Sequence, residues 1–269
     1  MNNAPLSTGR ELILNACEGA LQIAVTDNEK LICFQEWLEP RRATEILAPA
    51  ISQICALTNI PADSFRRIGC FAGPGSFTGI RLVLTTAAAM RRVSRARLAQ
   101  LDYLQALATT AAKWRELLYP VPVFVITHAR SNLVHCQKFI SYGPLIPAQP
   151  EHEVELIAPA SALARLAAQP CYVCGSALAR YPDLFGLPVT GAGPKGAPEA
   201  VLMPELIHPS AAALCLLARH GDYFPNDVEP RYVRGCDAVE NLAKAEGPDS
   251  KKLQELERRL QAGIEQAQD

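Results

Sequence analysis

The chain of 269 residues lacks long apolar runs and has few aromatic side chains. No apolar segment approaches the roughly 20 residues that span a bilayer, and no N-terminal stretch joins a basic region to an apolar segment of secretory length. We therefore expect a cytoplasmic protein without a membrane segment. Aromatic residues make up 6% of the chain and do not interleave with its arginines, which argues against a dedicated single-stranded nucleic-acid surface.

The sequence also lacks the motifs of several enzyme classes. It has no Walker A loop. Its glycine-rich segment, residues 73–79, is not a hydrolase elbow, because Pro74 and Thr78 stand where G-x-S-x-G needs glycines around Ser76. Thr78 also occupies the last glycine position of a dinucleotide-binding fingerprint. A peptidase would need a metal cluster or a nucleophile with its base, and the sequence shows neither.

The nine cysteines do not indicate disulfides or a metal centre. An odd number scattered through apolar sequence is typical of reduced thiols used as small hydrophobic residues. Cys171 and Cys174 have the C-x-x-C spacing of a zinc half-site or redox pair, but no second pair exists and the flanking residues predict a strand. His128 and His135 have no acidic partner at a metal-binding spacing. We expect no metal ligands and no catalytic residues.

Charge is unevenly distributed along the chain, although its net value is −1. Between Arg41 and Arg97, nine arginines outnumber two acidic residues and give a net charge of +7, whereas residues 237–269 carry −3. A basic segment can face RNA or an acidic protein partner. A solvated arginine surface is the more common explanation for such a segment.

Apolar periodicity predicts an α/β protein in which three strands, a helix, a strand and a second helix follow one another. This order opens a lobe of the actin, hexokinase and Hsp70 type, and a second start near Val121 predicts a duplicated actin-like, Hsp70-like (ribonuclease H-like) two-lobe fold. The predicted strands are 11–17, 20–26, 31–36, 68–72, 121–127, 134–140 and 171–175, and the predicted helices are 44–57, 80–93, 161–168 and 211–219.

These elements suggest a division into three parts. Residues 1–108 form the N-terminal lobe, residues 109–236 a second, degenerate lobe, and residues 237–269 a helical tail with an apolar stripe from Leu253 to Ile264. Proline-rich loops are predicted at residues 142–150 and 191–198.

The most informative segment is the glycine loop, Gly73-Pro74-Gly75-Ser76-Phe77-Thr78-Gly79. Three glycines and a proline favour a tight turn with positive φ angles, and Ser76 or Thr78 can cap the following helix. Such a loop exposes backbone N–H groups at a helix N-terminus. These groups can hold a phosphate, or the glycines can let another backbone approach closely.

The loop, with Ile80-Arg81 after it, closely resembles the TsaB (YeaZ) family, the non-catalytic partner in the bacterial threonylcarbamoyladenosine tRNA-modification complex. Four further segments resemble family motifs in the same order. They are Pro40-Arg41-Arg42-Ala43-Thr44-Glu45-Ile46-Leu47, Leu101-Asp102-Tyr103-Leu104-Gln105-Ala106-Leu107-Ala108, Ala129-Arg130 with Val134, and Glu229-Pro230-Arg231-Tyr232-Val233-Arg234. The resemblance thus extends from about Glu11 to Arg234.

The resemblance implies an accessory, dimerisation subunit without a catalytic centre, a paralogue of the transferase subunit TsaD and its obligate partner. The helices at 44–57 and 80–93 would bind TsaD or a second copy of the chain. The implied interface and loop residues are Gly73, Pro74, Gly75, Ser76, Phe77, Thr78, Gly79, Arg81, Thr85, Ala88, Ile46 and Ala50. A TsaE-like P-loop ATPase would be the third partner, and tRNA would be contacted only indirectly. The chain alone would bind no cofactor. A homodimer of the free chain, and ATP or ADP at the complex interface, stay open.

Three departures from the family pattern concern chemistry. Asn15-Ala16-Cys17 replaces the usual Asp-Thr-Ser, so a carboxylate for magnesium and hydroxyls for phosphate are missing. Ala43 stands where a histidine is common, and His128 where an aspartate is common. Two alternatives remain: a free-standing nucleotide-binding small-molecule kinase of the actin-like fold, and a glycoprotease-like peptidase.

Overall fold

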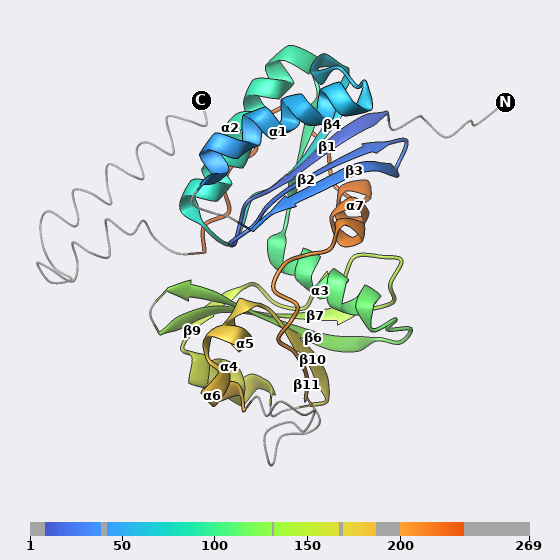
Figure 1. Cartoon of the computed structure of the whole chain (residues 1–269). Helices are drawn as coiled ribbons and strands as arrows, with labels where there is room; N and C mark the ends of the chain where they lie inside the picture. Colours follow the sequence, from blue (N-terminus) through green and yellow to red (C-terminus); the bar gives the residue numbers. More distant parts are fainter. Residues whose placement is uncertain (1–8, 39–41, 131, 167–168, 187–199, 234–269) are drawn as a thin grey trace, which may run out of the picture. The chain divides into compact units, whose positions relative to one another are not determined.

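The first sheet has five strands and follows the predicted order. The computed structural model describes residues 9–38, 42–130, 132–166, 169–186 and 200–233 (Figure 1). The strands β1 (Arg10–Asn15), β2 (Leu21–Asp27), β3 (Lys30–Trp37), β4 (Arg67–Phe71) and β5 (Arg97–Leu101) lie in the order β3-β2-β1-β4-β5. The first three strands are antiparallel, and β1, β4 and β5 are parallel. β1 and β2 are buried on both faces, which explains their nearly continuous apolar sequence.

Two helices cover one face of this sheet. Figure 1 shows α1 (Ala43–Thr58) and α2 (Phe77–Ser94) side by side. α1 ends at Asn59 and α2 at Arg95, each in the left-handed conformation that closes a helix. A short 3-10 helix, η2 (Ala62–Ser64), links α1 to β4. The two helices predicted at 44–57 and 80–93 are thus present with slightly longer bounds.

The second sheet repeats the order of the first. Its strands are β6 (Val121–Arg130), β7 (Leu133–Ser141), β8 (Gln149–Pro150), β9 (Glu155–Ile157), β10 (Cys171–Cys174) and β11 (Ala200–Met203). They run β11-β10-β6-β7-β8, with β9 also paired to β7. β6 is antiparallel to β7 and parallel to β10, as β1 is to β2 and β4. The predicted α/β duplication is therefore confirmed.

Three short helices accompany the second sheet, and two longer ones cross between the sheets. α4 (Pro159–Leu166), α5 (Ser176–Arg180) and α6 (Pro182–Phe185) belong to the second half. α3 (Tyr103–Trp114) follows β5 but packs on β6, β7 and β10, whereas α7 (Ala211–Arg219) follows β11 and packs on β1, β2 and β5. α3 and α7 also pack on each other. Each half therefore supplies its last helix to the other half's sheet.

This exchange alters the predicted division of the chain. The boundary predicted after residue 108 falls within α3, and α7, expected in the second lobe, covers the first sheet because its leucines complete that core. One apolar core spans both sheets, and residues 1–231 form one compact unit. Residues 232–269 form another unit, but the helical tail predicted in it lies outside the described residues, as does the loop predicted at 191–198.

The remaining differences from the sequence prediction concern short elements. Strands β5, β8, β9 and β11 and helices α5 and α6 were not predicted, since two to five residues are too few to show a period. Among the residues described, none of the helices combines the length and apolar character needed to cross a membrane.

Candidate functional site

The glycine loop lies directly against the hairpin turn between β1 and β2. A side-chain carbon at Gly75 would be 2.1 Å from the carbonyl oxygen of Cys17, and one at Gly79 would be 2.0 Å from that of Ala16. Real Cβ atoms do not approach a carbonyl oxygen so closely. The two glycines are therefore required for contact between the loop and the turn. The sequence predicted that this loop either binds a phosphate or lets another backbone approach closely. The structure shows the close approach of a backbone.

Two backbone N–H groups of the loop, those of Ser76 and Gly79, are bonded within the chain. The N–H of Ser76 donates to the carbonyl oxygen of Cys17, and that of Gly79 donates to the Ser76 hydroxyl at 3.2 Å. The N–H of Ile80 donates to the Ser76 carbonyl at 2.9 Å. Ser76 is thus the predicted cap of α2. Bonded in this way, these donors are not directed at a phosphate.

The start of the loop is fixed by two segments that are distant in sequence. The N–H of Tyr103 donates to the Gly73 carbonyl at 3.1 Å, and the N–H of Arg231 donates to the carbonyl of Ala72 at 2.8 Å. The Arg231 guanidinium lies 2.8 Å from Asp102, which caps α3. Burial raises the pKa of Asp102, and the neighbouring Arg231 opposes that rise. The segments quoted around residues 73, 102 and 231 thus meet at one place.

The end of β1 is a closed polar network. The Asn15 side chain is 1% exposed; its amide donates to Gln22 at 2.8 Å and its oxygen accepts from the Cys17 N–H at 3.0 Å. Gln22 in turn donates to Glu36 and to the Pro209 carbonyl. Asn15 therefore fastens the turn. A kinase of this fold would need a carboxylate here, where the chain has an amide engaged on both sides.

Glu18, at the tip of the same turn, contacts the second half of the chain. The Ser176 hydroxyl donates to its Oε1, and Ser176 also accepts from the His128 N–H at 2.9 Å. The other oxygen, Oε2, is buried and has no hydrogen-bond partner in the described part of the chain. Burial raises the pKa of Glu18 to about 7, against the lowering effect of the Ser176 hydrogen bond. The turn is thus held between the glycine loop and α5.

A cavity of about 320 Å³ opens beside this turn. It lies between the turn and the first residues of α1 and α2, and its lining includes Ala43, Thr44, Ser76 and Thr78. At its edge the Arg81 guanidinium stacks on the Phe77 ring, 4.0 Å from the ring centroid. Phe77 is 40% exposed. Exposed arginine and aromatic pairs are typical of protein interfaces.

Six positions on the outer faces of α1 and α2 carry small side chains. On α1 the residues Ala48, Ser52 and Ala56 are exposed and recur every four positions. On α2, Thr85 and Ala89 are exposed and Ala88 is half-buried. We call these six residues the small-residue surface. Because small side chains let backbones approach, another helix can pack closely on it.

Residues 39–160 match the family model described as TsaD: tRNA N6-adenosine threonylcarbamoyltransferase. Two solved structures are similar to nearly the whole chain. YeaZ from Pseudomonas aeruginosa is 17% identical with a TM-score of 0.68, and an uncharacterized protein with similarity to peptidase YEAZ from Pseudomonas aeruginosa is 18% identical with a TM-score of 0.67. In both cases the match covers 84% of this chain and 100% of the other chain. No curated protein matches.

A segment of the chain thus matches the TsaD family model, and the chain has the fold of YeaZ. The TsaB/YeaZ resemblance found in the sequence is thereby confirmed. The segment that matches the TsaD model includes α1, the glycine loop and α2. The loop and the small-residue surface therefore lie within the segment that matches the TsaD model, whereas the β1–β2 turn precedes it.

The residues predicted for the interface differ in their burial. Ala50 is 3% exposed and packs in the chain's own core, because it lies on the inner face of α1. Gly73, Pro74 and Gly79 are buried as well, and Gly79 serves the contact with Ala16. These four residues cannot contact a partner directly in this conformation. Ser76, Phe77, Thr78, Arg81 and Thr85 are exposed, while Ile46, Gly75 and Ala88 are half-buried.

Cysteines and histidines do not assemble into a metal site in the described residues. Cys171 and Cys174 lie on β10, as predicted, and both are buried free thiols. Three positions apart on a strand, they point to opposite faces. His135 is buried beside Thr127, and His128 lies near Tyr181. No group of three His, Cys, Asp or Glu side chains that could hold a metal occurs in this part of the chain.

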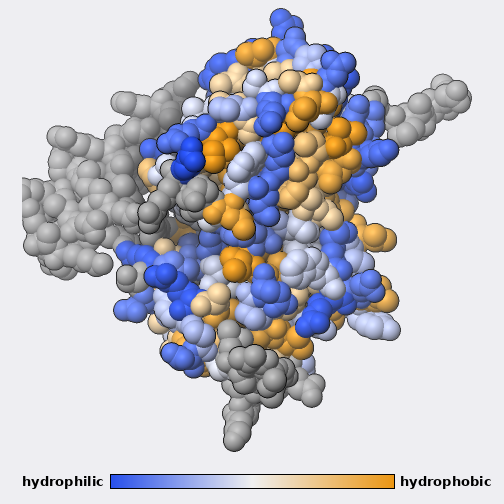
Figure 2. All heavy atoms as spheres, in the orientation of Figure 1, coloured by the Kyte–Doolittle hydropathy of each residue, from blue (hydrophilic) through white to orange (hydrophobic). Residues whose placement is uncertain are grey.

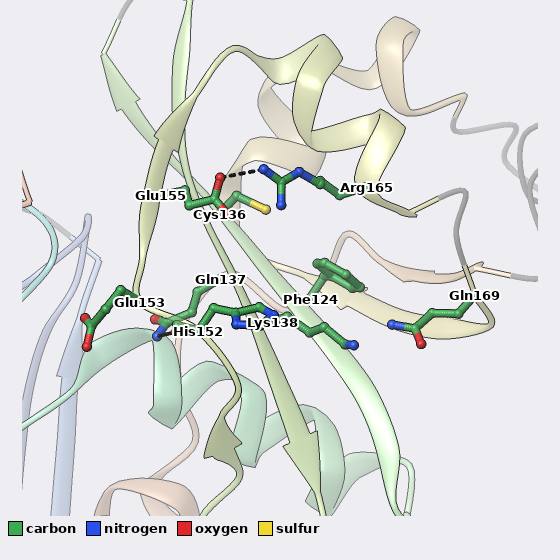
Figure 3. A pocket seen from close by; sticks show the side chains of 9 residues that line it. All are labelled: Phe124, Cys136, Gln137, Lys138, His152, Glu153, Glu155, Arg165 and Gln169. Atoms are coloured by element: carbon green, nitrogen blue, oxygen red, sulfur yellow. Dashed lines mark hydrogen bonds and ion pairs between the residues drawn. The ribbon is translucent and has the colours of Figure 1, made fainter.

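A second cavity, of about 170 Å³, lies beside β7 (Figure 3). Its charged side chains are already paired: Arg165 lies 2.7 Å from Glu155, and Lys138 lies 2.5 Å from Glu151. Burial raises the pKa of the Cys136 thiol to about 12, so this thiol stays protonated and unreactive near neutral pH. The cavity offers neither an unpaired charge nor an activated nucleophile.

Several arginines of the basic N-terminal stretch bind the chain itself. Arg67 pairs with the buried Glu11 at 3.2 Å and stacks on Tyr223. Arg91 and Arg92 both pair with Asp227. Part of the net positive charge found in the sequence thus anchors the segment after α7. Sequence reasoning missed these contacts because the partners are more than 130 positions away in all but one case.

Proposed function

We propose that this chain is a non-catalytic accessory subunit of a tRNA N6-adenosine threonylcarbamoyltransferase complex. It binds a TsaD-like catalytic paralogue through α1 and α2 and stabilises that subunit's active conformation. The observation that carries the proposal is the small-residue surface, which lies on two neighbouring helices of a TsaD-family domain. A surface of this kind accepts a helix pair from a related domain.

The composition of the surface supports a protein partner. Ala48, Ser52 and Ala56 on α1 and Thr85 and Ala89 on α2 expose little side-chain bulk. A typical solvated helix face carries long charged side chains instead. The stacked pair of Phe77 and Arg81 stands at one end of α2 and offers an anchor of the type that dominates binding energy.

The closed turn supports an accessory role over catalysis by this chain alone. The position where a nucleotide-dependent relative would offer a carboxylate holds Asn15, which is fully engaged with Gln22 and Cys17. Glu18 is occupied by Ser176. The loop donors of Ser76 and Gly79 are bonded within the chain. Binding triphosphate through any of these groups would require its present contacts to break.

In this proposal the subunit acts by differential affinity. It binds the active state of the catalytic paralogue more tightly than the inactive state, and so increases the population of the active state. A TsaE-like P-loop ATPase resets the assembly, with ATP or ADP held at the interface between subunits. The catalytic paralogue handles the threonylcarbamoyl group and the tRNA adenosine, so tRNA contacts this chain only indirectly.

The decisive variant is Ala88→Arg. The change places a long cationic side chain on the half-buried centre of the small-residue surface, and we expect at least a 100-fold loss of affinity for the TsaD-like subunit, about 3 kcal/mol. Ala164→Arg is the matched control, because Ala164 is an exposed alanine on α4 in the second half. Circular dichroism melts of both variants check that the fold is retained.

The assay is reconstitution of tRNA modification. The cognate TsaD-like subunit, the P-loop ATPase, tRNA, ATP and a supply of threonylcarbamoyl-adenylate are combined with and without this chain, and threonylcarbamoyladenosine is measured by mass spectrometry. We expect product to depend on the chain, to be lost with Ala88→Arg, and to persist with Ala164→Arg. Equal product without the chain contradicts the proposed function. Normal activity of Ala88→Arg despite a measured loss of binding contradicts the scaffold mechanism.

A further inference from the structure

A buried carboxyl group, that of Glu18, links the two halves of the chain. Glu18 lies in the turn between β1 and β2, and the hydroxyl of Ser176 on α5 donates to its Oε1. Its Oε2 is buried and has no hydrogen-bond partner among the described residues. A buried ionised oxygen without a partner is unfavourable, whereas a protonated carboxyl is neutral and can donate a hydrogen bond. The geometry therefore favours a protonated Glu18.

The hydroxyl of Tyr103 belongs to the same site. Tyr103 is the first residue of α3, is 1% exposed, and donates to the Ile207 carbonyl at 3.2 Å. The same hydroxyl faces Glu18. Burial raises the pKa of Tyr103, and the charge of Glu18 raises it further. Burial also raises the pKa of Glu18, and the hydrogen-bond donors that oppose this rise, Ser176 first, include Tyr103. Tyr103 therefore lies between two acceptors, Ile207 and Glu18.

The single hydrogen of the Tyr103 hydroxyl cannot serve both acceptors at once. When Glu18 is protonated, its Oε2 can donate to the Tyr103 oxygen while the Tyr103 hydroxyl donates to the Ile207 carbonyl, so all three groups are bonded. When Glu18 is ionised, its Oε2 and the Ile207 carbonyl compete for the hydrogen of Tyr103. One of the two buried acceptors then loses its partner, which destabilises this arrangement.

The Ile207 carbonyl belongs to the connection that crosses between the two sheets. Residues 204–210 lead from β11 to α7, and Figure 1 shows this connection running past α3. The Pro209 carbonyl in the same connection accepts from Gln22 on β2 at 2.8 Å. On the face shown in Figure 2, side chains cover the region between the two sheets. Loss of the bond to Ile207 thus loosens the connection that leads to α7.

We propose that Glu18, Tyr103 and Ile207 form a proton-controlled latch between the two halves of the chain. In the closed state Glu18 is protonated, and hydrogen bonds run from Glu18 through Tyr103 to Ile207. When Glu18 loses its proton to solvent, the β1–β2 turn moves away from α5, water reaches the carboxylate, and residues 204–210 lose the bond from Tyr103. Opening also loosens the start of α2, because Cys17 in the same turn accepts from the Ser76 N–H. The effect on partner binding through α2 rests on the proposed function, but the latch itself does not.

Other titratable groups lie around Glu18, on the turn, α3, β6, β10 and the 204–210 connection. They are Cys17, Asp102, Tyr103, His128, Cys174 and His208. Burial raises the pKa of the two thiols and of the tyrosine, so these groups stay protonated near pH 7. Burial lowers the pKa of both histidines, and Arg180 on α5 lowers that of His128 further. Asp102 pairs with Arg231 at 2.8 Å. Glu18→Gln leaves all of these groups in place, so a pH response that is lost in this variant belongs to Glu18.

Linkage sets the size and the pH range of the effect. Glu18 has a pKa of about 7 in the closed state, and its ordinary value is 4.5 in the open state, where water reaches it. Because the closed state binds the proton more tightly, the latch is most stable below pH 4.5 and loses stability as the pH rises towards 7. From these two values, the equilibrium constant for opening rises about tenfold between about pH 6 and pH 8 and changes little above pH 8.

Hydrogen–deuterium exchange of the free, full chain tests the latch. Exposure times at about pH 6 and pH 8 are matched for the intrinsic pH dependence of amide exchange, so that protection reports local opening. The reporters are the N–H groups of Gly175, which donates to the Leu206 carbonyl, of Leu206 itself, and of Ser76, which donates to the turn. We expect their protection to fall about tenfold in the wild type. It should stay constant in Glu18→Gln, whose amide carries no charge and can still donate to Tyr103.

Two further variants separate the hydrogen-bond chain from the carboxyl alone. In Tyr103→Phe the Ile207 carbonyl lacks its donor at every pH. Peptides from residues 204–210 should therefore be weakly protected and insensitive to pH, whereas the peptide that contains Ser76 should still respond. Glu205→Gln removes an exposed carboxylate from the same connection. This matched control should behave like the wild type.

Three results would overturn the proposal. The first is equal protection of the wild type at the two pH values. The second is an equal loss of protection in every peptide, including those of α4, because that pattern reports global unfolding and not a local latch. The third is a wild-type pH response of residues 204–210 in Tyr103→Phe. The experiment uses the chain without a partner, so its failure is distinguishable from failure of the tRNA-modification assay.

Discussion

Replacing Glu18 with glutamine should make the stability of this protein less dependent on pH. The carboxyl is enclosed between the β1–β2 turn and α5, with Oε1 accepting from Ser176 and Oε2 buried without a partner in the described part of the chain. Burial raises its pKa to about 7 from an ordinary value of 4.5. The folded state therefore holds this proton more tightly than the unfolded state does.

The direction and size of the effect follow from linkage. Below about pH 4.5 the carboxyl is protonated in both the folded and the unfolded state, so it does not change the free energy of unfolding. As the pH rises from there towards 7, the unfolded state loses the proton first, so the free energy of unfolding falls. At about 1.4 kcal/mol per pH unit the loss reaches up to about 3 kcal/mol, and above pH 7 it levels off. Glutamine keeps the shape and the acceptor for Ser176 but carries no charge, so the variant should avoid this loss.

The assay is urea unfolding of the wild type and Glu18→Gln at about pH 5 and pH 8. Since both proteins share every other titrating group, the difference between their free energies of unfolding isolates Glu18. The variant should gain about 2–3 kcal/mol relative to the wild type between the two pH values. Glu205→Gln, at an exposed carboxylate, should show no such change. A difference between wild type and Glu18→Gln that stays constant with pH would refute the reasoning.

Two further predictions test the contacts of the glycine loop. Gly79→Ala forces a carbon to within 2.0 Å of the Ala16 carbonyl oxygen. We therefore expect the free energy of unfolding to fall by about 3 kcal/mol and the melting temperature to fall by several degrees. The control, Thr85→Ala on the outer face of α2, should change the free energy of unfolding by less than about 0.5 kcal/mol. Asp102→Asn keeps the cap of α3 but removes the charge facing Arg231. In a double-mutant cycle with Arg231→Leu, we expect a coupling energy of about 1 kcal/mol. If the two losses of stability are additive, the ion pair contributes nothing to the free energy of unfolding.

Much of the fold was predictable because periodicity carries it. The long segments, such as the strands at 121–127 and 134–140 and the helices at 44–57 and 80–93, are present, since each buries one face or both. The duplication was predictable from the order of these elements. The exchange of α3 and α7 was not, because periodicity shows that a helix has an apolar face but not which sheet that face covers.

The site was predictable only in part. The sequence indicated Gly73 to Gly79 as a backbone feature with Ser76 as a cap, and the structure confirms both. It did not indicate Glu18 or Ser176, because neither belongs to a motif and they lie 158 positions apart. It also could not separate buried from exposed interface candidates. Ala50 and Ala88 look alike in sequence, and only packing against the sheet assigns Ala50 to the core.

The crossing of α3 and α7 has a consequence for synthesis of the chain on the ribosome. α7 covers the first sheet, but its residues, 211–219, are made about 110 residues after β5 is complete. Until then, one face of the N-terminal sheet lacks this helix, and α3 in turn must wait for β6, β7 and β10 of the second sheet, which end at Cys174. Neither half can reach its final state in the order of translation. Folding is therefore completed only when nearly the whole 231-residue unit has emerged, and a fragment that ends after the first half should aggregate.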